Sequence, residues 1–130
     1  MREAAKEQKT RGGLNLFLES VRKIKGEQVT APGAEKVQKQ VLVGPAQGWP
    51  GWVMRLFTLA PGGHTPRHVH PWLHVNYVVS GRGTIFIDGK EYSVEAGFVA
   101  CIPGGTEHQF KNAGEEDFSV ICIVPEEGEG

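Results

Sequence analysis

Four of the five histidines in this 130-residue chain fall within the eleven residues from 64 to 74, the densest group of metal-ligating side chains in the sequence. His68 and His70 are two residues apart, so in a β-strand both imidazoles point from one face, roughly 6.5 Å apart along the backbone. Pro71 interrupts that strand, because proline cannot donate to a sheet ladder, and His74 follows where the next strand begins. His108 comes later, after a second glycine-spaced segment. Since neutral imidazole is a common ligand of transition metals, we predict that His68, His70, His74 and His108 hold one metal ion.

The glycines and prolines around these histidines extend the pattern into two longer motifs. The first runs through Gly62, His68, His70, position 74 and Gly81, and the second through Gly97, Pro103, Gly105, His108 and Asn112. Both spacings resemble the two signature motifs of the cupin superfamily, with one departure, because His74 stands where the family pattern has Glu. The segment His68-Val-His-Pro-Trp-Leu-His74 is similar to that of small single-domain cupins with four histidine ligands, a subgroup described as manganese-binding. The resemblance covers roughly residues 36 to 125.

The resemblance implies an all-β fold, a double-stranded β-helix or jelly-roll barrel. It also implies one divalent transition metal per chain, with manganese or iron favoured, whereas zinc, nickel and copper also accept imidazole and stay open. A six-coordinate ion held by four imidazoles would keep two positions for water, dioxygen or a bidentate substrate. Because His74 replaces a carboxylate, the ion would keep its full charge and favour anionic ligands.

Length and composition limit what else the chain can be. With 130 residues and a formal net charge of −1, we expect one domain and no nucleic-acid partner. No apolar run approaches the ~20 residues of a membrane span, and residues 1–10 lack the apolar block of a signal peptide. These features predict a cytoplasmic protein with no membrane partner. Cys101 and Cys122 are therefore expected to be buried, reduced thiols inside apolar strands.

The chain is expected to divide into an N-terminal arm over residues 1–35, a barrel over 36–125 and an acidic tail over 126–130. Within the arm, apolar residues at positions 14, 17, 18, 21 and 24 follow the period of an amphipathic helix, which Gly26 would end. At about eleven residues such a helix is marginal alone. Its apolar side should therefore pack on the barrel or on a partner subunit.

About eight strands are expected in the barrel. The hairpin signal is strongest at Asp88-Gly89, which suits a type I′ turn between residues 84–87 and 90–94. The remaining strands are expected over residues 36–43, 52–59, 75–79, 98–102, 108–111 and 118–124. Three of these, 75–79, 98–102 and 118–124, are apolar on both faces, so each face should be covered. A homodimer is the simplest cover for the outer face.

The substrate pocket is expected to include five further residues. Arg55 suits a substrate carboxylate, because guanidinium offers bidentate geometry, although an outward ion pair is an equal alternative. Asn76 shares the strand face of His74, and Trp72 lies between two ligands. Phe110 and Cys101 would supply apolar wall.

These features favour a metal-dependent cupin enzyme acting on a small anionic, phenolic or enolic molecule, foremost as a dioxygenase-type oxidoreductase. No nucleophile paired with a base, phosphate loop or basic patch competes with this interpretation, and no catalytic residue beyond the ligands can be assigned. The alternatives are a Lewis-acid lyase or isomerase of the same fold and a metal-loaded small-molecule binding protein. Because binding needs neutral imidazole, metal affinity is expected to fall as the pH drops through about 6.5.

Overall fold

The computed structural model describes residues 6–9, 11–13 and 15–129, and these residues form strands joined by short turns. The eight strands predicted for the barrel are present within one or a few residues of the expected bounds. They are β4 (Glu35–Val43), β5 (Trp52–His64), β6 (His74–Ser80), β7 (Arg82–Ile87), β8 (Lys90–Glu95), β9 (Val99–Ile102), β10 (His108–Lys111) and β11 (Phe118–Pro125). Three strands precede them, namely β1 (Lys6–Lys9), β2 (Asn15–Leu18) and β3 (Gly26–Gln28).

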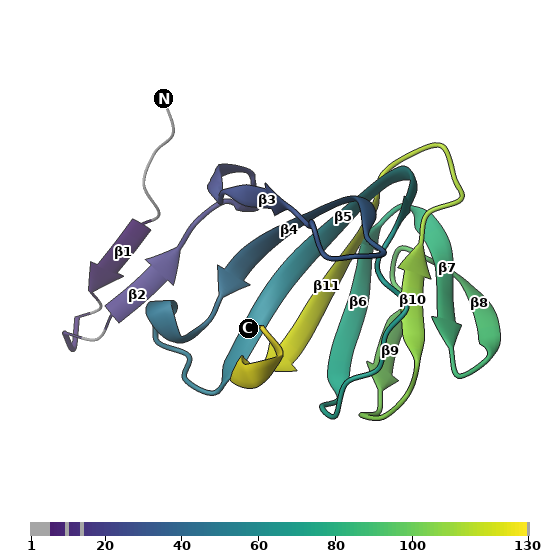
Figure 1. The fold of residues 1–130 in the computed structure, drawn as a ribbon. Helices are drawn as coiled ribbons and strands as arrows, with labels where there is room; N and C mark the ends of the chain where they lie inside the picture. The colour runs from purple at the N-terminus through teal and green to yellow at the C-terminus, as the bar shows by residue number, and fades with distance from the viewer. Residues whose placement is uncertain (1–5, 10, 14, 130) are drawn as a thin grey trace.

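The barrel strands form two groups that face each other (Figure 1). One group has the order β3-β4-β5-β11-β6-β9 and the other the order β8-β7-β10. Both groups contribute to the larger of the two hydrophobic clusters that the described residues form, and this cluster consists of Val37, Leu59, Val78, Ile85, Val94, Ile102, Phe110, Phe118 and Val120. A jelly roll is expected to have such a shared core, so the all-β barrel of the predicted fold class is confirmed.

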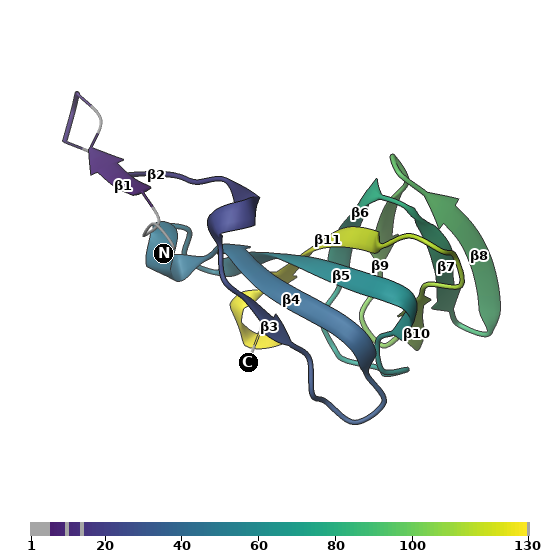
Figure 2. The ribbon, with the colours of Figure 1, turned by 90° about the horizontal axis from the view of Figure 1, so that it is seen from above.

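The long strand β5 links the two groups, as the view from above shows (Figure 2). It pairs with β11 up to Leu59 and with β4 as far as its last residue, His64, which also pairs with Lys111 of β10. The bend lies at Gly62, whose φ of 84° favours glycine, and at Gly63. A Cβ on Gly63 would lie 2.7 Å from the carbonyl oxygen of Lys36. The glycine pair therefore allows β5 to cross from one group to the other just before the histidine-rich loop.

The hairpin between β7 and β8 has the predicted turn. Asp88 and Gly89 adopt φ angles of 49° and 88°, and the flanking strands pair from Ile87 with Lys90 to Arg82 with Glu95. The type I′ prediction is confirmed.

The predicted helix over residues 14–24 is wrong. In the described part of this segment, β2 pairs with β1, and a single 3-10 turn, η1 (Val21–Lys23), follows. Leu14 lies outside the described residues. The helix fails because the Ser20 side chain accepts a hydrogen bond from the Arg22 backbone N–H, which caps a new turn in mid-segment.

Strand β3 lies within the segment expected to be an arm, and it joins the barrel sheet beside β4. The β1–β2 hairpin instead stands apart from the barrel (Figure 1). Two further 3-10 turns are present, η2 (Pro45–Gln47) and η3 (Glu126–Gly128). No helix in the described residues has the length and apolar character needed to cross a membrane.

Candidate metal centre

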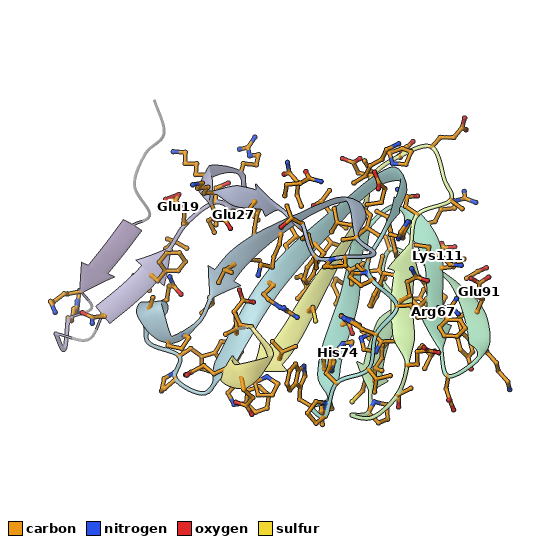
Figure 3. The ribbon with its side chains drawn as sticks, viewed as in Figure 1. Glu19, Glu27, Arg67, His74, Glu91 and Lys111 are labelled. Carbon is orange, nitrogen blue, oxygen red and sulfur yellow. The ribbon has the colours of Figure 1, made fainter. Side chains whose placement is uncertain are left out.

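The four predicted ligands come from two strands and one loop. His74 is the first residue of β6, where Figure 3 labels it, and His108 is the first residue of β10. His68 and His70 lie in the loop between β5 and β6. Reciprocal backbone hydrogen bonds of 3.1 Å join His68 to His108, so the loop is aligned with the start of β10.

Contacts on both sides of His68 fix this loop against the barrel. The Thr65 N–H donates to the Phe110 carbonyl oxygen and the Thr65 hydroxyl accepts from the Phe110 N–H, each at 2.9 Å. The guanidinium of Arg67 lies 3.8 Å from the ring centre of Phe86 on β7 (Figure 3), a cation–π contact. The Gly105 N–H donates to the His70 carbonyl oxygen at 2.8 Å.

Three of the histidines form a group that could hold a metal ion. One ring nitrogen from each of His68, His70 and His108 can be chosen so that all three lie within 4.8 Å of one another. His74 lies beside this group, since its ring centre is 4.6 Å from that of His108 and 5.2 Å from that of His70. The distance between His74 Nε2 and His108 Nε2 is 3.1 Å.

Oxygen acceptors fix the orientation of three of the rings. His108 Nδ1 lies 2.9 Å from the Thr106 carbonyl oxygen, and His70 Nδ1 lies 3.2 Å from that of Trp72. His74 Nδ1 lies 2.7 Å from Asn76 Oδ1. Because an oxygen of this kind only accepts, each Nδ1 must carry the proton. In the neutral rings, each Nε2 is then left as a bare lone pair.

This arrangement fits a bound cation. Two lone pairs 3.1 Å apart, those of His74 and His108, repel each other unless a positive charge lies near both. Metal-binding histidines commonly donate their other ring N–H to a carbonyl or carboxylate oxygen, as these rings do. The donor set therefore suits a transition metal ion bound through Nε2 atoms.

The cavity also keeps the rings in the neutral form that binds metal. Burial, together with a smaller contribution from the neighbouring His108, lowers the pKa of His74 to about 4, although the hydrogen bond that the ring donates to Asn76 acts in the opposite direction. Burial likewise lowers the pKa of His68 to about 4, with smaller contributions from His108, His70 and Arg55. The pKa values of His70 and His108 also lie below the usual 6.5, mainly through burial. At neutral pH all four rings are therefore neutral.

The histidines open into a cavity of about 430 Å³ with a largely apolar wall. Four of the five predicted pocket residues line this cavity, namely Arg55, Trp72, Asn76 and Phe110. The Trp72 ring stacks on the His70 ring with centres 4.6 Å apart. The remaining apolar wall comes from Val29, Ala31, Val37, Phe57, Leu59, Val69 and Val120.

Cys101 does not line the cavity, and the expectation that it is buried is wrong. It is exposed on β9, where it pairs with the outward-facing Val75. Cys122 lines the cavity instead, because on β11 it pairs with the buried Asn76 and shares its face. Its sulfur lies 3.8 Å from His74 Nδ1. The alternation along 118–124 could have indicated this, since Cys122 shares parity with Phe118 and Val120.

Lys39 and Gly128 also line the cavity, and sequence reasoning missed both. Lys39 lies on β4 in a polar stretch that gave no signal of an inward position. Gly128 lies in η3, just beyond the last barrel strand. Its place depends on how that turn folds back over the barrel.

Comparison with known proteins agrees with this fold. The family model described as "Cupin domain" matches residues 55–124, which is more than half of the chain. The chain belongs to the cupin family. The match begins at Arg55 on β5 and ends at Val124 on β11, so it includes all four histidines of the candidate centre.

The cupins similar to this chain are named for different activities. Auxin-binding protein 1 of Arabidopsis thaliana is 37% identical over 78 residues, which are 53% of this chain and 39% of that protein. The 1-methylthio-D-xylulose 5-phosphate methylsulfurylase of Rhodospirillum rubrum is 32% identical over 72 residues, 55% of this chain and 46% of the enzyme. The chain thus spans about half the length of the curated relatives it matches, or less.

Among solved structures, the polyketide cyclase RemF from Streptomyces resistomycificus is similar with a TM-score of 0.76 and 28% identity. The similarity covers 83% of this chain and 79% of RemF.

Proposed function

We propose that this cupin is a metal-dependent enzyme acting on a small organic molecule with an anionic, phenolic or enolic group. The observation that carries the proposal is the 3.1 Å approach of two Nε2 atoms whose rings both hold their proton on Nδ1. That arrangement gains stability when a cation sits between the rings, and it opens into a cavity large enough for a small organic ligand.

In this proposal His68, His70, His74 and His108 bind one divalent ion per chain. The close approach of their ring nitrogens supports His68, His70 and His108 as ligands. The ring contacts of His74 with His70 and His108 support His74 as the fourth ligand. Manganese or iron is our first choice, with zinc, nickel and copper as alternatives that the same nitrogen donors accept. When bound, the ion would supply a Lewis acid that stabilises negative charge on a substrate oxygen.

The other cavity residues would bind and orient the substrate. Trp72 and Phe110 contribute aromatic side chains to the cavity wall, and Asn76 holds His74 in its ring orientation. None of the cavity-lining residues in the described part of the chain is Asp or Glu. None of the described lining side chains is therefore a carboxylate that could deprotonate the substrate.

An oxygen-dependent oxidoreductase of the dioxygenase type is the leading reaction class, because a four-nitrogen set without a carboxylate base favours substrate and dioxygen as the remaining ligands. A Lewis-acid reaction without oxygen is the second candidate. It is favoured by the similarity to RemF, which is named as a polyketide cyclase.

One experiment separates these classes. Protein loaded with manganese or iron is incubated with phenols, diketones and enols, with and without dioxygen, while oxygen uptake and product are measured. Oxygen uptake coupled to product supports the oxidoreductase, and equal anaerobic turnover supports the Lewis-acid reaction. If no substrate turns over while one of them raises the melting temperature, the protein is a binding protein and the enzymatic proposal fails.

We also propose a homodimer formed through the outer face of β6 and β9. On this face Val75, Tyr77, Val79 and Val99 are exposed, Val99 by 74%, although their alternate neighbours on β6 are buried. Light scattering should give twice the chain mass, and Val99→Lys should give a monomer, because the charge would be buried unpaired in the interface. A monomeric wild-type protein at micromolar concentration would contradict this proposal.

A further inference from the structure

The cavity contains a pair of cationic side chains beside the histidines. Arg55 on β5 and Lys39 on β4 both line it, and their side chains are only 11% and 26% exposed. Taking positive charge out of water costs free energy unless an anion compensates it. The place where these two cations meet is therefore suited to an anion.

A carboxylate of the same chain now lies at that place. Glu129, which follows η3, has one oxygen 2.8 Å from Lys39 Nζ and the other 3.3 Å from Arg55 Nη1. Its two oxygens are thus divided between the two cations, and its side chain is 25% exposed. The carboxylate enters from outside the barrel rather than from a barrel strand.

Glu129 contacts only one of the three guanidinium nitrogens of Arg55. Its contact with Arg55 involves a single nitrogen at a distance longer than the 2.7–2.9 Å typical of charge-assisted hydrogen bonds. The Arg55 Nη2 atom donates to the sulfur of Cys122 at 3.1 Å, and sulfur is a weak acceptor. The buried Nε atom has no partner within the described residues. Arg55 therefore retains the capacity to bind a carboxylate in bidentate fashion.

The turn that carries Glu129 is attached to the barrel by few bonds. The Glu126 N–H donates to the Gly51 carbonyl oxygen at 3.0 Å, and Glu126 Oε1 accepts from the Gly51 N–H at 2.9 Å. Gly128 packs against the Trp72 indole so closely that a Cβ would lie 2.9 Å from Nε1. Because η3 follows β11 and pairs with no strand, it can move without breaking the sheet.

We propose that Arg55 and Lys39 form a carboxylate-binding subsite for the substrate, and that Glu129 occupies this subsite until a substrate carboxylate displaces it. The ligand class is a monocarboxylate with an apolar body, since the wall beside the cations includes Phe57, Leu59 and Val120. Glu129 then acts as an internal competitor. The inference rests on the proposed function only in that the cavity receives a small organic ligand, and it needs no bound metal.

Calorimetric titration of benzoate into protein freed of metal by chelation and dialysis tests this, in a buffer without chloride. If Glu129 occupies the subsite for all but about a tenth of the time, E129Q should bind benzoate about tenfold more tightly than wild type. E127Q is the matched control, because it makes the same charge change at an exposed residue of the same turn, and it should leave the affinity unchanged. Benzamide, the neutral isostere, should bind both proteins equally.

A second substitution tests whether the higher benzoate affinity of E129Q depends on Arg55 and Lys39. In the E129Q background, R55Q should remove the gain, and K39Q provides the same test should R55Q prove unfolded by circular dichroism. E129Q binding benzoate no more tightly than E127Q would overturn the inference, as would an equal gain for benzamide, which would mean that the turn merely blocks space. Repeating the titrations with metal separates the two proposals. If E129Q binds benzoate more tightly but the protein binds no metal, the proposed function alone is contradicted. If the protein binds metal but E129Q binds benzoate no more tightly, the subsite alone is contradicted.

Discussion

His74 Nδ1 lies 2.7 Å from the side-chain oxygen of Asn76, two residues along the same strand. The Asn76 amide nitrogen in turn donates to the Ile121 carbonyl oxygen at 3.3 Å, which sets the amide so that its oxygen faces the ring. Both side chains are 2% exposed. Asn76 therefore determines that His74 presents Nε2, and not Nδ1, to the other histidines.

Replacing this acceptor should weaken metal binding. Asn76→Leu removes the partner of Nδ1, so His74 loses its fixed tautomer, and we expect metal affinity to fall about 10–100-fold. Asn76→Asp keeps an acceptor oxygen at the same place and should retain most of the affinity. Competition with a chromogenic chelator measures both, and equal losses in the two variants would contradict the role given to Asn76.

Substitution of single ligands should distinguish them from the fifth histidine. His68→Ala, His70→Ala and His108→Ala should each reduce bound metal to well below one ion per chain, because each removes a nitrogen donor. His64→Ala is the matched control, since His64 is half-buried at the end of β5 and does not line the cavity. Loss of metal in His64→Ala equal to that in His108→Ala would place the site elsewhere.

Acid should destabilise the metal-free protein over a defined pH range. Because burial lowers the pKa values of His74 and His68 to about 4, the unfolded chain binds protons below pH 6.5 that the folded chain does not. Stability is thus full above pH 7 and is lost as the pH falls from 6.5 towards 4. Thermal unfolding at steps of half a pH unit measures the slope, which should be smaller in His74→Gln. A melting temperature independent of pH over this range would contradict the lowered pKa values.

The same shift changes the expected pH dependence of metal binding. Sequence alone predicted a loss of affinity through about pH 6.5, the pKa of a free imidazole. Because the pKa values of His74 and His68 are lowered to about 4, protons compete strongly for these two rings only nearer that pH. Metal titrations between pH 4 and 8 should therefore show most of the loss below pH 5.5, and a midpoint at 6.5 would contradict this account.

The loop between β9 and β10 should be sensitive to one small substitution. A Cβ on Gly104 would overlap the backbone carbonyl of Pro71 in the loop that carries His70 and Trp72. We expect Gly104→Ala to lower the melting temperature and to weaken metal binding, because that loop must shift. Gly12→Ala, which meets nothing within 4 Å, is the control. A Gly104→Ala protein with unchanged metal affinity would show that the loop can adapt.

The barrel and most of the cavity were predictable because they depend on local spacing. The period of two along β6 places His74 and Asn76 on one face, and the Asp88-Gly89 pair predicts the hairpin turn that the structure has. The predicted cytoplasmic location and the homodimer stay predictions.

The errors arose where the outcome depends on partners distant in sequence. The segment near residue 17 has a helical period but forms strand β2, because it pairs with β1 and because Ser20 caps a separate 3-10 turn after it. Cys101 was assigned to the wrong side of its strand because the register of β9 on β6, which sets its face, is not local information. The contact of Glu129 with Lys39 joins residues 90 positions apart, and no spacing rule predicts it.

We infer that histidines from the loop before β6 and from the starts of β6 and β10 hold one transition metal ion. The most direct measurement is elemental analysis of the protein purified without added metal, in parallel with His108→Ala. We expect about one manganese or iron ion per wild-type chain and almost none in the variant. Wild-type protein that carries no ion, and takes up none when incubated with each of these metals, would contradict it.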